Sequence, residues 1–172
     1  MCLALYIGST RTLPLIPYPD YPRSALASAE WPQMAQRFCT AELAEEEQVV
    51  RRHFSMPIVV LAGSYEGCSC GFNYGRQYPG YENEKEDLRA AQESVSALVA
   101  YIRDNQVREL YACWFGDESL PHETERRVTI AELSSATFFF REKELLHVGG
   151  KSSVRFSRRV QNRVRRNKDR PA

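Results

Sequence analysis

Three short segments are apolar at every position, so that both faces of an extended strand would be apolar. They cover residues 3–7, 58–62 and 110–115. Strands of this kind are covered on both faces or lie centrally in a sheet. Shorter strands are expected over residues 13–16 and 37–39. The apolar residues at 138–140 and 145–148 flank a charged turn and predict a β-hairpin.

Helical spacing is clearest over residues 82–105. One apolar stripe recurs there at intervals of three and four, formed by Leu88, Ala91, Val95, Leu98 and Ile102. A second helix is expected over residues 41–54, with Thr40 as its N-cap. A short third helix is expected to begin at Thr129, because Thr129 and Glu132 have the spacing of a capping box.

This mixed order of elements predicts an α+β fold. We expect a two-layer sandwich in which a mixed or mainly antiparallel sheet is packed by one long and one or two shorter helices. Residues 1–150 would form this globular domain and residues 151–172 a basic tail. The prolines crowded between residues 14 and 32 predict a meandering surface segment.

Charge is distributed unevenly along the 172 residues, although the formal net charge is only +1. Residues 151–172 hold nine of the 23 Lys and Arg residues and one of the 22 Asp and Glu residues, so this segment carries +8 and the rest of the chain −7. Such asymmetry is typical of a folded body with a basic tail. The tail arginines expected to contact a partner are Arg155, Arg158, Arg159, Arg163, Arg165 and Arg166.

The tail is expected either to be disordered or to form an amphipathic helix capped by Ser153, with Phe156 on its apolar side. Arginine-rich segments bind nucleic-acid backbones through counterion release and often fold on binding. The first functional hypothesis is therefore a binding protein whose tail contacts nucleic acid or an acidic protein surface. A solvated tail, or a tail docked on the acidic body of its own or a partner chain, remains an alternative, and a homo-oligomer stays open.

The chain has five cysteines, and its first residues lack the features of a secretory signal. Its longest apolar runs are much shorter than the roughly 18 residues needed to span a bilayer. We therefore expect a soluble cytoplasmic protein, without membrane contact, whose thiols are mostly reduced.

The segment 63–75 is the most unusual local sequence, with four glycines around Cys68 and Cys70. It is neither a Walker loop nor a dinucleotide-binding fingerprint. Cys68 and Cys70 are candidate metal ligands or reactive thiols, although structural thiols are the simpler interpretation. Two thiolates are too few for a zinc site, so a further ligand would have to come from elsewhere in the chain, the candidates being Cys2, Cys39, His53 and Cys113. No cofactor is strongly implied.

Cys2 is a third candidate for catalysis, because removal of Met1 would give it both a thiol and an α-amino group that acts as its base. The opening Met1-Cys2, the run from Tyr6 to Ser9, and Leu13 and Tyr18 resemble the start of class II glutamine amidotransferases. The resemblance covers about 20 residues. It implies that Cys2 is the nucleophile and that the fold has four layers. The alternative is a small buried cysteine at the start of a central strand.

The last candidate is an acidic loop over residues 116–125, where Asp117, His122 and Glu123 could bind a divalent cation or transfer protons. A solvated connection is the simpler interpretation. The second functional hypothesis is thus a thiol-centred enzyme or metalloprotein that uses Cys68 and Cys70, or an amidohydrolase-like protein that uses Cys2.

Overall fold

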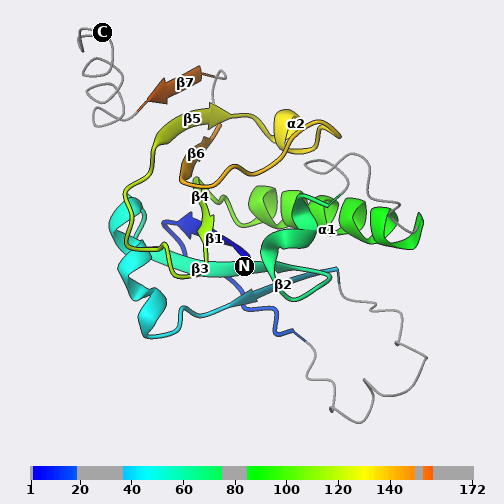
Figure 1. Ribbon diagram of the computed structural model, residues 1–172, viewed down its shortest axis with the longest axis horizontal. Helices are drawn as coiled ribbons and strands as arrows, with labels where there is room; N and C mark the ends of the chain where they lie inside the picture. The colour runs from blue at the N-terminus through cyan, green and yellow to red at the C-terminus, as the bar shows by residue number, and fades with distance from the viewer. Residues whose placement is uncertain (1, 19–36, 75–84, 150–152, 157–172) are drawn as a thin grey trace, which may run out of the picture.

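The computed structural model describes residues 2–18, 37–74, 85–149 and 153–156 (Figure 1). Seven strands form one sheet, in the spatial order β2 (Phe38–Ala41), β3 (Ile58–Ser64), β1 (Leu3–Ser9), β4 (Glu109–Trp114), β6 (Glu144–Val148), β5 (Thr124–Val128) and β7 (Ser153–Phe156). Strands β5 and β6 are parallel, and the other neighbours are antiparallel. This mixed sheet with its helices confirms the predicted α+β class. The described strands form a single sheet, so the four-layer fold implied by the amidotransferase resemblance is wrong.

Strand β1 lies in the interior of the sheet, as its uninterrupted apolar sequence predicts. Leu5 pairs with Ala62 of β3 on one side and with Ala112 of β4 on the other. Because side chains alternate along a strand, Leu5 belongs to one core cluster while Ala4 and Tyr6 belong to a second cluster. The sheet is therefore covered on both faces at β1.

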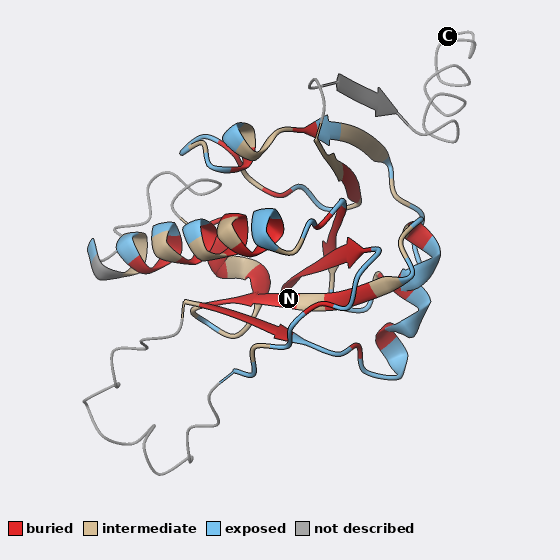
Figure 2. Cartoon of the chain, turned by 180° about the vertical axis from the view of Figure 1, so that it is seen from behind, coloured by how far each residue is buried: buried red, intermediate tan, exposed pale blue. Residues whose placement is uncertain are grey.

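Helix α1 (Lys85–Asp104) covers the first face. The predicted apolar stripe is confirmed, since Val95, Leu98 and Ile102 are buried against β1 and β4 in one core cluster. Figure 2 shows buried residues along the central strands and on the inner side of α1, with exposed residues on its outer side. A short 3-10 helix, η3 (Ser69–Phe72), adjoins α1, β1 and β3.

The second face is covered by η2 (Glu46–His53), a 3-10 helix whose Val50 packs on Tyr6, Tyr111 and Leu43. The prediction of a helix from residue 41 with Thr40 as its cap is wrong. Thr40 lies in β2, and its hydroxyl donates to the Pro14 carbonyl and accepts from the Ile16 amide. A hydroxyl used in this way is not free to cap a helix.

The expected hairpin over residues 138–148 is also wrong. Only residues 144–148 form a strand, β6, which pairs with β4 and β5. Phe138 and Phe140 are buried, but the Phe140 amide and carbonyl are paired with the side chain of Asn73 instead of a neighbouring strand.

Smaller differences concern short segments. Residues 13–16 contribute only an isolated bridge from Ile16 to Thr40. Strand β5 was not predicted, because its sequence is polar and falls partly in the expected acidic loop. The capping box at Thr129 is confirmed at the start of α2 (Ile130–Leu133). Among the described residues, no helix has the length and apolar character of a membrane span.

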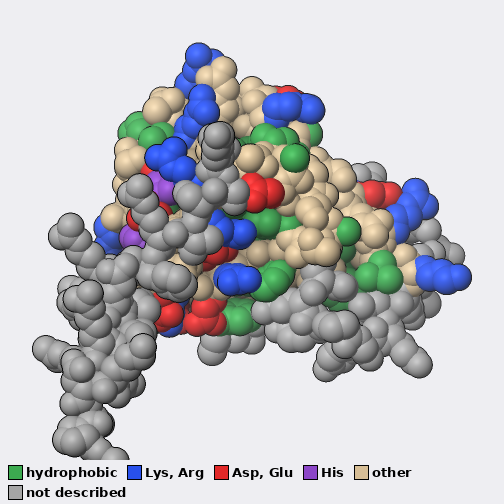
Figure 3. All heavy atoms as spheres, turned by 90° about the horizontal axis from the view of Figure 1, so that it is seen from above, with side chains coloured by type: hydrophobic (Ala, Val, Ile, Leu, Met, Phe, Trp, Pro, Cys, Tyr) green, Lys and Arg blue, Asp and Glu red, His purple; other side chains and the backbone are tan. Residues whose placement is uncertain are grey.

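The basic tail begins differently from the prediction. Ser153 does not cap a helix, because residues 153–156 form β7, which pairs with the open edge of β5. The other tail arginines, from Arg158 onward, lie outside the described residues, as does most of the proline-rich segment. Figure 3 views the side that carries β5, where the coloured Lys and Arg side chains are dispersed among acidic and hydrophobic ones.

The Asn73 side chain links the chain after η3 to the segment before β6. Its Nδ2 donates to the Phe140 carbonyl and its Oδ1 accepts from the Phe140 amide, both at 2.8 Å. We predict that Asn73→Ala lowers the free energy of unfolding by about 1–3 kcal/mol, because it leaves two buried backbone groups without partners. Urea denaturation measures this change.

Asn105→Ala is the matched control, because the Asn105 side chain donates to a backbone carbonyl from a half-buried position. Its effect should stay below about 1 kcal/mol. Equal losses in the two variants would contradict the assigned role of Asn73.

Candidate metal centre

The segment that follows β3 turns back tightly. The Gly67 amide donates to the Ser64 carbonyl at 2.9 Å, and Gly67 has a φ of +80°, a conformation that favours glycine. Ser64 then holds the Cys68 carbonyl twice, through its amide at 2.8 Å and its hydroxyl at 2.7 Å. These contacts fix where η3 begins and place Cys68 immediately before it.

Ser69 connects η3 to the sheet. Its hydroxyl accepts from the Leu5 amide at 2.8 Å and donates to the Ala62 carbonyl at 2.6 Å. The hydroxyl thus stands between β1 and β3 and satisfies one backbone group of each strand. Since Ser69 is only 1% exposed, water does not replace it there.

Two backbone contacts hold the start of β1, one to η3 and one to the residue after β4. The Leu3 amide donates to the Cys70 Sγ at 3.2 Å. The Phe115 amide, just after β4, donates to the Cys2 carbonyl at 3.0 Å. Cys2 is exposed, whereas Cys68 and Cys70 are half-buried.

As a result, the sulfur atoms of Cys2, Cys68 and Cys70 all lie within 4.8 Å of one another. These are the three thiols that the sequence offered as candidates for catalysis. In the part of the chain that the structure describes, no other group of three His, Cys, Asp or Glu residues meets the same distance criterion. The structure therefore joins what the sequence treated as two separate candidate sites.

The remaining candidate ligands lie elsewhere. Cys39 is buried in β2. Cys113 is buried with Tyr6 in the core cluster of the opposite face, and His53 stacks on Tyr111 at a ring distance of 4.3 Å. Cys70, by contrast, packs against the cluster on the α1 face. Cys113 and His53 are thus separated from the three-thiol cluster by the sheet.

The two loop thiols influence each other. Burial raises the pKa of Cys68 to about 12; the Cys70 backbone amide opposes this shift, and the neighbouring Cys70 thiol adds to it. A backbone N–H donor also faces the second of these sulfurs, since the Leu3 amide donates to the Cys70 Sγ. Such donors stabilise negative charge on sulfur and are typical of the groups that surround metal-bound thiolates.

A different polar cluster lies on the opposite face. The Tyr6 hydroxyl is 3.1 Å from a carboxylate oxygen of Glu118 and 3.3 Å from one of Glu47. Burial, followed by these two carboxylates, raises the pKa of Tyr6 well above its usual range. The same two glutamates line a cavity of about 550 Å³ between η2 and the residues after β4.

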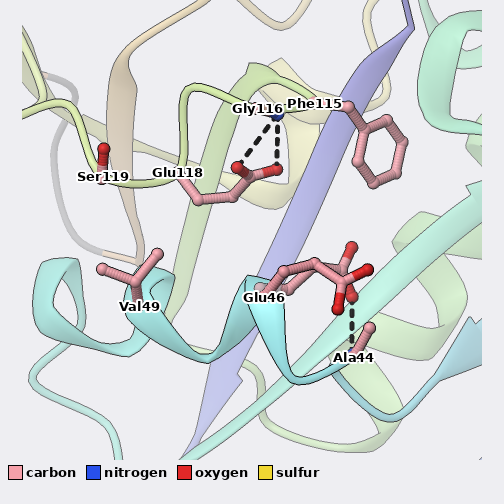
Figure 4. Close-up of a pocket in the computed structure, with 8 residues that line it drawn as sticks. Ala44, Glu46, Val49, Phe115, Gly116, Glu118 and Ser119 are labelled. Carbon is pink, nitrogen blue, oxygen red and sulfur yellow. Dashed lines mark hydrogen bonds between the residues drawn. The ribbon is translucent and has the colours of Figure 1, made fainter.

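Figure 4 shows the Glu118 carboxylate turned back toward its own chain, where both oxygens accept from the Gly116 amide at 3.0 and 3.1 Å. The Glu47 carboxylate accepts from the Ala44 amide at 2.8 Å. Both carboxylates are therefore used to hold the backbone around the cavity.

The acidic loop does not converge on a cation site. The Glu123 carboxylate lies 3.8 Å from the Lys143 ammonium. The His122 ring lies 6.0 Å from the His53 ring, and the Asp117 amide donates to the Trp114 carbonyl and closes a turn.

The sequence did not indicate the role of Ser69, the residue that positions the thiols. Its place between two cysteines was the only available signal.

The Ser69 hydroxyl gives a prediction about stability. We expect Ser69→Ala to lower the free energy of unfolding by about 1–3 kcal/mol, since a buried amide and a buried carbonyl lose their partner. Ser96→Ala is the control, because the Ser96 hydroxyl bonds the Gln92 carbonyl on the exposed side of α1 and alanine favours a helix. Urea denaturation that finds the two variants equally stable would refute this role.

His53 predicts how stability depends on pH. Burial lowers the pKa of His53 below 6.5; the Glu118 carbonyl contact opposes this, while Arg52 and His122 lower it further. The folded state therefore favours neutral His53. The neutral His53 ring contributes to the stability of the folded state. This stabilisation is fully present above pH 6.5 and is lost as the pH falls below that value toward the pKa of His53 in the folded state.

The measurement is urea unfolding at pH 7.5 and pH 5.5. We expect His53→Gln to reduce the loss of stability between these two values, whereas His122→Gln, which removes only the smallest of the causes that lower the His53 pKa, should retain most of it. An unchanged pH dependence in His53→Gln would contradict the prediction.

Comparison of the chain with protein-family models, with curated proteins and with solved structures found no match. The interpretation of the site therefore rests on its own geometry.

Proposed function

We propose that this protein is a metalloprotein that binds one zinc ion through the thiolates of Cys2, Cys68 and Cys70. The observation that carries the proposal is the convergence of three sulfurs within 4.8 Å of one another. Residues 2 and 70 are far apart in sequence, so their meeting depends on the fold.

The donor set suits zinc. Thiolates are soft ligands that select Zn²⁺, Cu⁺ or iron–sulfur centres, whereas Mg²⁺ and Ca²⁺ require oxygen ligands. With Zn–S bonds of about 2.3 Å, two sulfurs of a tetrahedral site lie about 3.8 Å apart. The observed limit of 4.8 Å therefore requires a closure of at most about 1 Å, within the range of side-chain rotation.

Three further arguments favour the same proposal. The Leu3 amide donates to the Cys70 sulfur and so stabilises negative charge on it. A divalent cation that displaces the thiol protons would also offset the repulsion between the resulting thiolates through its own positive charge. Ser69 holds the two loop cysteines in place from within the sheet.

Three protein ligands leave one tetrahedral position open, as in catalytic zinc sites, where zinc acidifies a bound water or polarises a substrate. Cys2 is exposed, so this position is accessible from solvent. We therefore favour a zinc-dependent enzyme over a purely structural zinc protein.

The prediction is that full-length protein loaded with zinc and freed of excess metal retains one zinc ion per chain. Cys2→Ser, Cys68→Ser and Cys70→Ser should each weaken zinc binding at least about 10-fold, since each removes one of three ligands. Competition with a chromogenic zinc chelator measures the affinity.

Cys113→Ala and Cys39→Ala are the controls, because both cysteines are buried outside the cluster. They should retain the zinc affinity of the unaltered chain. Zinc binding that survives in all three cluster variants would overturn the proposal.

Native mass spectrometry of the same sample tests the competing function, in which a processed Cys2 is a nucleophile. A chain that has lost Met1, binds no zinc and forms a covalent adduct at Cys2 with a glutamine-analogue electrophile would favour that function. A zinc-bound chain whose Cys2 is protected from alkylation supports the metal centre.

A further inference from the structure

The geometry of the three-thiol cluster also bears on redox chemistry. A disulfide requires two sulfurs to approach to about 2.05 Å. Since the cluster sulfurs lie within 4.8 Å of one another, two of them need to close by less than about 3 Å, which side-chain rotation supplies. The cluster therefore places each thiol near two potential resolving partners.

Exposure identifies the thiol that an oxidant meets first. Cys2 is exposed, whereas Cys68 and Cys70 are half-buried and Cys39 and Cys113 are buried. Oxidation of cysteine follows accessibility as well as thiolate character. Cys2 is thus the residue at which peroxide reacts.

The backbone identifies its partner. The Leu3 amide donates to the Cys70 Sγ at 3.2 Å, so this sulfur lies against the peptide that directly follows Cys2. A bond between Cys68 and Cys70 would instead close a small ring around Ser69. The Ser69 hydroxyl is held by Leu5 and Ala62, and this anchoring opposes the rotation that such a ring requires.

We infer that hydrogen peroxide converts this site into a Cys2–Cys70 disulfide and releases the metal; this rests on the same cysteines as the proposed zinc centre. The Cys2 thiolate attacks one peroxide oxygen, and the O–O bond breaks to release hydroxide and leave a sulfenic acid. The Cys70 thiolate attacks the Cys2 sulfur, and a second hydroxide leaves. Two thiolates lose two electrons, peroxide gains them, and two protons complete two waters.

The consequence is an exchange of one crosslink for another. In the reduced state the ion joins the start of β1 to η3, and in the oxidised state the disulfide joins the same two elements. Zinc keeps its charge and leaves, because Cys68 alone remains of its three protein ligands.

The test is peroxide treatment of the full-length, zinc-loaded protein, followed by alkylation, trypsin digestion and mass spectrometry. Tryptic cleavage separates the peptide ending at Arg11 from the peptide of residues 53–76. We expect a disulfide between these two peptides, with one zinc released per chain to a chromogenic indicator. Cys68→Ser should still form the cross-link, and Cys70→Ser should not.

Absence of this cross-link, or its persistence in Cys70→Ser, would overturn the inference. The outcomes also separate it from the zinc proposal. A chain that binds no zinc but forms the Cys2–Cys70 disulfide would refute the zinc centre and support the redox pair. A chain that binds zinc but yields only a Cys68–Cys70 disulfide, or no disulfide, would support the zinc centre and refute the Cys2–Cys70 pair.

Discussion

The thiol site depends on the two hydrogen bonds of the Ser69 hydroxyl. This hydroxyl stands between β1 and β3 and bonds a backbone group of each. A serine used in this way fixes the residues on both sides of it, which are Cys68 and Cys70. Because β1 is the neighbour of β3, Cys2, which directly precedes β1, lies beside these two residues. One buried side chain thus sets the relative position of all three sulfurs.

The sheet separates two polar regions of different character. On the η2 face, Tyr6, Glu47 and Glu118 are buried, and the carboxylates bond to backbone amides around a cavity. Near the α1 face, Cys70 packs at the edge of the apolar core while Cys2 reaches solvent. The first region uses its polar groups to hold the chain together. The second leaves soft donor atoms accessible, and accessible donors are what a metal ion or an oxidant requires.

Sequence alone could predict the elements that depend on local pattern. The stripe from Leu88 to Ile102 indicated α1, and the capping box indicated α2. The polar strand β5 could not be recognised, because its arginines serve ionic contacts such as Arg126 with the buried Glu144 at 3.2 Å. The expected hairpin failed because the Asn73 side chain replaces a strand as partner of Phe140. The spacing of apolar residues does not reveal where a side chain, and not a neighbouring strand, bonds the backbone.

The candidate site was predictable in its parts but not as a whole. Cys68 and Cys70 were marked by their glycine-rich surroundings and Cys2 by its place directly after Met1. Their convergence required knowing that β1 and β3 are neighbours and that Ser69 enters the ladder between them. Spacing along the chain carries no trace of that contact, because residues 2 and 68 become adjacent only through the sheet. The same reasoning explains why Cys113, equally plausible in sequence, lies on the other face.

The most direct test of the three-thiolate centre is the X-ray absorption spectrum of the zinc-loaded, full-length protein at the zinc edge. Our account predicts three sulfur atoms at about 2.3 Å and one nitrogen or oxygen atom at about 2.0–2.1 Å. A first shell with at most one sulfur atom, or one made wholly of nitrogen and oxygen, would contradict it.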